Sequence, residues 1–149
     1  MIAAGCDIGS LTAKALIMNE RGLLAGEIIR VKSSTLDSAA EVMDKALTAG
    51  GLRFSDVDCC CSTGYGRFEI PFAQTNMSEI SCHGLGAFRA DNSIRTIIDI
   101  GGQDCKIILI DAEGNVRDFI MNDKCAAGTG RSLEILAKTI GIDIENLGY

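Results

Sequence analysis

Two short turns in the chain each combine an aspartate at the end of an apolar run with a glycine two residues later. They are Asp7 with Gly9 and Asp99 with Gly101. Glycine permits a tight turn and brings main-chain N–H groups close to a phosphate. A carboxylate suits a hard cation such as Mg²⁺, usually through water. One such turn arises by chance in ordinary hairpins, whereas two in matching positions indicate a pair of phosphate-binding turns.

Polar and small residues around both turns are candidates for contacts with a nucleotide. The predicted cofactor-binding residues are Gly9, Ser10, Thr12, Lys14, Gly101, Gly102 and Asp104. We assign Asp7 and Asp99 to Mg²⁺, and Asp99 with Gln103 to catalysis, where Gln103 orients the attacking water. Lys14 could equally stand in solvent at the end of a strand, and this alternative stays open. The two turns are expected to face each other across one cleft.

The segment NDKCAAGTGR, residues 122–131, joins a cysteine to a small-residue loop that opens an expected helix. A helix N-terminus favours negative charge and lowers the pKa of a nearby thiol. Cys125 is therefore a candidate ligand of a soft metal centre, and the alternative is a free cysteine before a glycine-rich turn. The chain has seven cysteines and no CxxC pair, which excludes a zinc ribbon or a ferredoxin-like run within it.

The other cysteines are expected to be mainly structural. Adjacent residues of a strand point to opposite faces, so Cys59, Cys60 and Cys61 cannot chelate one ion together. Buried cysteine also behaves as a small apolar residue, and we expect Cys105 to lie in the core for this reason. On an expected helix, Cys82 and His83 diverge by about 100°, so packing is favoured over a ligand role.

The totals limit the classes of function. The chain has 149 residues and a formal net charge of −6, which argues against a nucleic-acid surface. No apolar run approaches the ~20 residues of a membrane-spanning helix, and no signal-peptide pattern opens the chain. We therefore expect a cytoplasmic protein without membrane partners. The odd cysteine count and the missing secretion signal argue against a disulfide framework.

The apolar pattern predicts an α/β protein in which one order of elements occurs twice. Strands are expected within residues 2–32, then a helix capped by Ser34 or Thr35 and stopped by Gly50 and Gly51. A buried strand at 57–64 and a helix at 77–90 follow. The pattern restarts with a strand at 94–102, a hairpin over 103–123 and a helix from about 130 to 141. These expectations place one subdomain at 1–92 and the start of a second, with the cysteine loop, at 93–149.

The two turns resemble those of the actin–hexokinase–Hsp70 superfamily of ATPases. Within it, five stretches are similar to motifs of the activator ATPases of 2-hydroxyacyl-CoA dehydratases and of the related ATPase subunits of benzoyl-CoA reductases. The stretches are DIGSLTAK, STGYGR, SEISCHGLGA, DIGGQDCK and MNDKCAAGTGR. The resemblance implies an actin-like (ribonuclease H-like) ATPase fold with a nearly complete first domain and a truncated second one. Leu11 departs from it, because the family often has a hydroxyl residue there.

The resemblance also implies a function. Members of the family are homodimers that use ATP and Mg²⁺ to drive one electron from a ferredoxin or flavodoxin through a shared 4Fe–4S cluster into the dehydratase or reductase. Each subunit supplies two cysteines, and Cys125 matches the first. The second lies in the part of the family sequence that follows this chain.

Two alternatives are a cluster-free phosphotransferase or nucleotide-sensing domain of the same superfamily, and a non-catalytic binding domain. A kinase is disfavoured because no base for a sugar hydroxyl stands out. The loop around Cys125 disfavours the non-catalytic domain.

Overall fold

The computed structural model describes residues 1–122 and 127–148, so Cys125 lies outside the described residues. The chain forms two compact units, Met1–Cys82 and His83–Tyr149, and both contain helix and strand, as expected for an α/β protein. These compact units are defined by contacts within the chain and not by comparison with ATPase subdomains. The expected boundary between ATPase subdomains at residues 92 and 93 stays a prediction.

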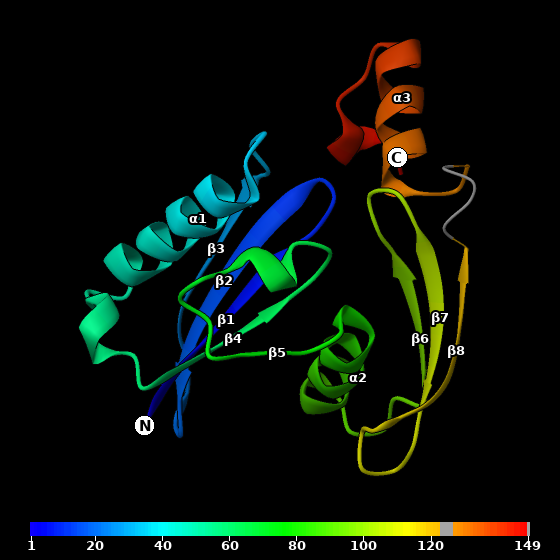
Figure 1. Cartoon of the computed structure of the whole chain (residues 1–149). Helices are drawn as coiled ribbons and strands as arrows, with labels where there is room; N and C mark the ends of the chain where they lie inside the picture. The colour runs from blue at the N-terminus through cyan, green and yellow to red at the C-terminus, as the bar shows by residue number, and fades with distance from the viewer. Residues whose placement is uncertain (123–126, 149) are drawn as a thin grey trace. The chain divides into compact units, whose positions relative to one another are not determined.

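The first unit is built on a five-stranded sheet with the order β3-β2-β1-β4-β5 (Figure 1). Its strands are β1 (Ile2–Ile8), β2 (Thr12–Asn19), β3 (Gly22–Arg30), β4 (Cys59–Thr63) and the short β5 (Thr75–Asn76). The first three strands are consecutive and antiparallel. Strand β4 then pairs in parallel with β1, and β5 in parallel with β4. This parallel pairing brings the end of β4 beside the end of β1, where the first turn begins.

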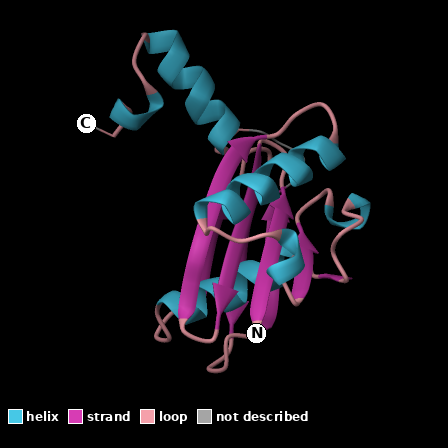
Figure 2. Ribbon diagram, turned by 90° about the vertical axis from the view of Figure 1, so that its left-hand side faces the viewer, coloured by secondary structure: helices cyan, strands magenta, loops and turns pink. Residues whose placement is uncertain are grey.

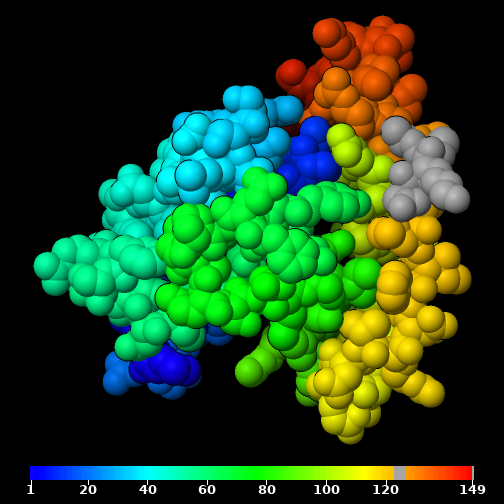
Figure 3. All heavy atoms as spheres, viewed as in Figure 1, coloured from blue at the N-terminus to red at the C-terminus, as the bar shows by residue number. Residues whose placement is uncertain are grey.

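Helix α1 (Thr35–Ala49) packs on one face of this sheet (Figure 2). It begins after Ser34, whose hydroxyl accepts a hydrogen bond of 3.1 Å from the amide of Asp37, and its C-cap is Gly50, so both expected boundaries are confirmed. The core between helix and sheet consists largely of small and β-branched residues: Cys6, Ala13, Ala15, Ile17, Ala39, Val42 and Ala46. In Figure 3 the outer face of α1, in cyan, forms part of the surface of this unit.

The run of three cysteines in β4 alternates as expected, but only its central member is core. Cys60 is buried, Cys61 is half-buried and Cys59 is exposed. Burial raises the pKa of the Cys60 thiol to about 11 and that of the neighbouring Cys6 to about 12. Both groups are therefore neutral thiols at neutral pH, whereas a metal ligand is a thiolate. These two residues are core residues and not candidates for a cluster.

The second unit contains an antiparallel sheet with the order β6-β7-β8. Its strands are β6 (Thr96–Ile100), β7 (Cys105–Ile110) and β8 (Val116–Asn122). Helix α3 (Gly130–Ile140) follows and ends at Gly141, whose φ of 75° is the left-handed conformation that glycine adopts readily. Helix α2 (Glu79–Ala90) spans the boundary of the two units. Its Gly84 lies close to Ile110 and Val116, where a Cβ would be 3.1 Å from the valine side chain.

Three short 3₁₀ helices complete the described structure, at Phe54–Asp56, Arg67–Glu69 and Ile144–Asn146. Among the described residues, no helix has both the length and the apolar character needed to cross a bilayer.

The duplicated order of elements is confirmed. Strands β1, β2 and β3 followed by α1 correspond to β6, β7 and β8 followed by α3. The correspondence extends to register: Asp7 pairs with Lys14 across β1 and β2, and Asp99 pairs with Lys106 across β6 and β7. Both copies therefore hold an aspartate and a lysine side by side at the mouth of a turn.

One face of the β6-β7-β8 sheet is apolar and exposed. Ile98, Ile107 and Ile120 form one row across the three strands, with 72%, 45% and 71% of their surface exposed. Ile100 and Leu109 extend the same face. A contiguous aliphatic surface of this kind is unusual on a monomeric soluble protein and favours association.

We expect the 149-residue chain to self-associate through this face. Ile120→Lys, which places a charge at the edge of the row, should lower the weight-average mass in sedimentation equilibrium. Ile28→Lys is the matched control, since Ile28 is 67% exposed but lies on β3 of the other unit. A monodisperse wild-type monomer that unfolds cooperatively would contradict the prediction.

Candidate functional site

The first acidic-glycine turn is closed by a main-chain hydrogen bond. The amide of Gly9 donates to the carbonyl of Thr12 at 3.0 Å, and a Cβ on Gly9 would lie 3.1 Å from the same oxygen. Lys14 Nζ lies 2.8 Å from Asp7 Oδ2. The lysine side chain is 40% exposed, so its ammonium can exchange this partner for a ligand in solvent. Ser10 and Thr12, also predicted to bind the cofactor, lie in the same turn.

The end of β4 completes the surroundings of Asp7. Thr63 pairs with Asp7 in the parallel register, and Gly64 follows with a φ of 83°. A Cβ on Gly64 would overlap Asp7 Oδ1 and would lie 2.5 Å from the main-chain carbonyl oxygen of Ile8, so only glycine fits there. Among the described residues, Thr63 Oγ1 is the buried side-chain oxygen without a hydrogen-bond partner. An orphaned hydroxyl beside a carboxylate fits a hydrated cation or a phosphate. Thr63 lies in the STGYGR motif, but the sequence analysis assigned no role to this residue.

The second turn has the same closure. The amide of Gly101 donates to the carbonyl of Asp104 at 2.9 Å. A Cβ on Gly101 would lie 2.5 Å from Asp104 Oδ1, so the aspartate side chain folds over the glycine. Gln103 is exposed at the tip of the turn, where it can reach a solvent molecule. The two turns therefore match in main chain as well as in sequence.

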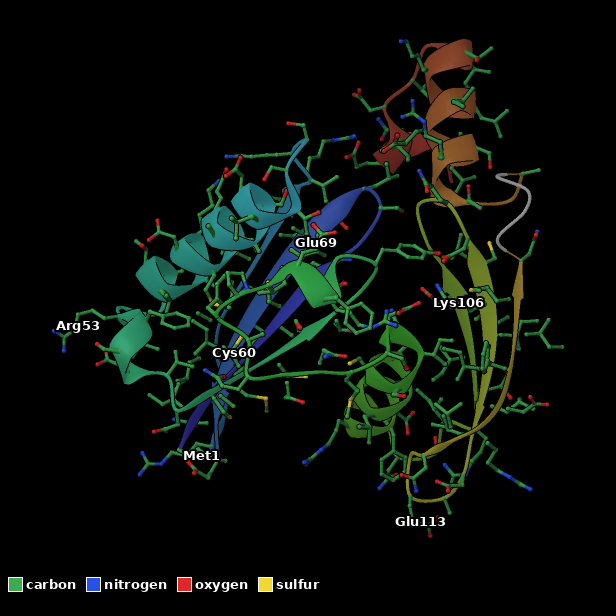
Figure 4. The ribbon with its side chains drawn as sticks, in the orientation of Figure 1. Met1, Arg53, Cys60, Glu69, Lys106 and Glu113 are labelled. Carbon is green, nitrogen blue, oxygen red and sulfur yellow. The ribbon has the colours of Figure 1, made fainter. Side chains whose placement is uncertain are left out.

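A buried lysine lies under the second turn. Lys106, labelled in Figure 4, is only 4% exposed, and its Nζ lies 2.8 Å from Asp104 Oδ2 and 3.6 Å from Asp99 Oδ2. His83 Nε2 lies 3.8 Å from the same Asp99 oxygen. Sequence reasoning did not single out Lys106. The alignment of CDIGSLTAK with IDIGGQDCK could have found it, because that alignment places Lys106 opposite Lys14.

The start of α3 is hydrogen-bonded to the second turn. The amides of Gly130 and Arg131 donate to the carbonyls of Gly101 and Gly102 at 2.8 and 3.3 Å. Cys105 Sγ donates to the carbonyl of Gly128 at 3.2 Å. The first amides of the helix are thus directed at the turn rather than left for an outside anion. Cys105 is half-buried at the start of β7, so its expected place in the core was wrong. Cys105 is the first residue of β7, and its thiol lies beside Gly128, just before α3.

The cluster site cannot be built from the described residues. Cys125 lies outside them, and within residues 1–122 and 127–148 no three His, Cys, Asp or Glu side chains gather to hold a metal ion. The assigned carboxylates, Asp7 in the first turn and Asp99 in the second, suit Mg²⁺, which keeps several waters and takes one or two carboxylates. The expected cleft between the two turns stays a prediction.

A duplicated strand–turn–strand–strand–helix unit is the arrangement of the actin-like fold class. The fold itself matches that class. A ROK hexokinase from Thermus thermophilus superimposes with a TM-score of 0.58 over 93% of this chain and 55% of its own. Its sequence identity of 12% supports the fold alone. The predicted actin-like fold is confirmed.

Residues 4–149 match the BadF/BadG/BcrA/BcrD ATPase family, and the chain belongs to it. It is 40% identical over 148 residues to the activator of lactoyl-CoA dehydratase of Anaerotignum propionicum, covering 99% of this chain and 57% of that protein. The activator of 2-hydroxyisocaproyl-CoA dehydratase from Clostridium difficile, solved with bound ADPNP, superimposes with a TM-score of 0.90 at 40% identity. That match covers 97% of this chain and 54% of the other. The chain thus spans about half the length of the curated relatives it matches.

Gly64 provides a test of the first turn. Gly64→Ala should lower the free energy of unfolding by about 2–4 kcal/mol, because it adds overlap with the main chain of Ile8 and with the Asp7 carboxylate to the cost of a positive φ. Gly51→Ala is the matched control: Gly51 has a φ of 64° but open space around its Cβ position. It should cost about 1 kcal/mol. Urea unfolding measures both, and equal losses would show that the close packing of Gly64 against Asp7 and Ile8 is not a constraint.

Proposed function

We propose that this chain is the nucleotide-binding part of an ATP-dependent one-electron donor that reductively activates a 2-hydroxyacyl-CoA dehydratase or drives a benzoyl-CoA reductase. Membership in the ATPase family and the likeness to a dehydratase activator solved with ADPNP support ATP as the ligand. One observation supports coupling between nucleotide binding at the second turn and the loop that contains Cys125. The loop after Cys125 is hydrogen-bonded, through Gly130 and Arg131, to the carbonyls of the second turn.

In this proposal the two turns bind the phosphates of ATP. The closed main chain at Gly9 and Gly101, with Gly102, Ser10 and Thr12, surrounds the phosphate oxygens, and Lys14 moves from Asp7 to a phosphate. Asp7 and Asp99 hold Mg²⁺, which neutralises phosphate charge when bound. Gln103 orients the water that attacks the terminal phosphorus as the bond to the bridging oxygen breaks. Asp104 acts by holding the turn closed.

The electron-transfer part of the proposal depends on Cys125. Cys125 of each chain of a homodimer would help to hold a shared 4Fe–4S cluster, and that cluster would supply a low-potential electron originating from a ferredoxin or flavodoxin. The contribution of the described residues is mechanical. When phosphate contacts at Gly101 and Gly102 change, the hydrogen bonds to Gly130 and Arg131 carry that change into α3 and the loop before it. The partner enzyme determines which acyl-CoA is the substrate.

The catalytic assignment is tested in the natural protein that contains these residues. Asp99→Asn and Gln103→Ala should each lower the rate of ATP hydrolysis by about 10- to 1,000-fold while changing ATP affinity by less than about fivefold. Asp118→Asn, on exposed β8 of the same unit, is the control for the first variant and should leave both quantities unchanged. Wild-type turnover in both variants would remove these residues from the mechanism.

A second experiment tests the cluster. After anaerobic reconstitution of the natural protein, Cys125→Ser should abolish the visible absorption of the cluster and its iron content, because a hydroxyl is a poor ligand for such a centre. Cys59→Ser, at an exposed cysteine of β4, should leave both unchanged. A dimer of the 149-residue chain alone should hold no stable cluster, since four thiolates are needed and Cys125 is its one candidate per subunit. ATP turnover with no cluster in the natural protein would favour a phosphotransferase or nucleotide sensor.

A further inference from the structure

Lysine is rarely buried unless it is paired, and Lys106 is buried under the second turn. Its ammonium has two carboxylate neighbours at unequal distances. Asp104 Oδ2, at 2.8 Å, accepts a direct hydrogen bond, whereas Asp99 Oδ2, at 3.6 Å, lies beyond hydrogen-bond distance. The lysine is therefore bound to Asp104 and exerts only an electrostatic attraction on Asp99.

In the described part of the chain, Lys106 has two acidic neighbours. Two carboxylates face one ammonium, and the second cationic neighbour of Asp99 is His83, 3.8 Å away and charged only when protonated. Because Asp104 accepts the direct bond, the described cationic neighbours of Asp99 are the more distant Lys106 and His83. That carboxylate also lies opposite Lys106 in the register of β6 and β7, which limits how it can move.

The first turn is arranged differently. There the ammonium of Lys14 is 2.8 Å from Asp7 itself and is 40% exposed, so the metal candidate and the lysine are direct partners. In the second turn the partner of the lysine is a third residue, Asp104, which has no charged counterpart in the first turn because Thr12 stands there. The equivalent lysines thus have different partners.

We propose that Lys106 is a positioning residue: clamped by Asp104, it holds the second turn closed and keeps Asp99 in place without occupying the oxygen that Asp99 offers to the nucleotide-bound cation. This inference rests on the proposed binding of a Mg²⁺–nucleotide complex. It recasts Asp104 as the residue that diverts Lys106 from Asp99 rather than as a direct contact of phosphate.

The test is the Mg²⁺ concentration at half-maximal binding of a fluorescent ADP to the natural protein. Asp104→Asn frees Lys106 to bind Asp99 and compete with the cation, so this midpoint should rise by about tenfold. Lys106→Met removes an attractive charge near Asp99, so the midpoint should fall, while ATP turnover also falls because the turn loosens. The double variant, which removes both members of the pair, should return the midpoint to within about twofold of wild type.

Lys138→Met, at an exposed lysine of α3 in the same unit, is the control and should leave the midpoint unchanged. A purely structural role for Lys106 predicts lower melting temperatures with midpoints that do not move, or that move in the same direction in both single variants, and either result overturns the inference. If Lys106→Met does not fold, the rise in Asp104→Asn and its return in the double variant decide. A wild-type protein that binds no nucleotide at any Mg²⁺ concentration would instead overturn the proposed function, and this inference with it.

Discussion

The main-chain hydrogen bond that closes each acidic-glycine turn is the constraint on which the candidate site depends. It joins Gly9 to Thr12 in one unit and Gly101 to Asp104 in the other, with nearly equal length. A closure this tight leaves little space for a Cβ at the glycine, and it fixes where the preceding strand ends. The aspartates at the ends of β1 and β6 are placed by it, and so are the lysines opposite them.

The two copies differ in what surrounds that closure. In the first, β4 runs parallel to β1 and supplies Thr63 and Gly64 beside Asp7, while Lys14 stays accessible. In the second, a buried ion pair of Lys106 and Asp104 lies under the turn. A buried pair of this kind is costly to separate, so it acts as a fixed support rather than as an exchangeable contact. The ammonium of Lys14 in the first turn can therefore change partners, whereas that of Lys106 in the second turn is held in place.

Hydrogen bonds link the second turn, which we propose binds phosphate, directly to the start of α3, the helix that follows Cys125 in sequence. Carbonyls of Gly101 and Gly102 accept from the first amides of the helix, and the thiol of Cys105 reaches the loop just before it. The second turn and the start of α3 are thus joined by main-chain hydrogen bonds. Such direct main-chain contacts transmit small displacements well, because hydrogen bonds tolerate little stretching.

The sequence by itself determined the elements and the two turns. Hydrophobic periodicity, the cap at Ser34 and the stop at Gly50 are local signals, and each depends on neighbours within a few residues. The repeated strand–Asp–Gly pattern is local as well, and it sufficed to indicate the two matching turns. The motif strings, through their resemblance to a known group of ATPases, identified the family.

Only the tertiary structure decided which groups share an environment. Thr63 lies beside Asp7 because β4 pairs with β1 across more than fifty residues. Lys106 and Asp104 are neighbours in sequence, but their burial is decided by the packed chain. Cys105 looked like a core residue in a strand, yet its position beside Gly128 depends on where the chain returns after β8. Burial and pairing are properties of the packed chain, and no window of sequence contains both partners of a long-range contact.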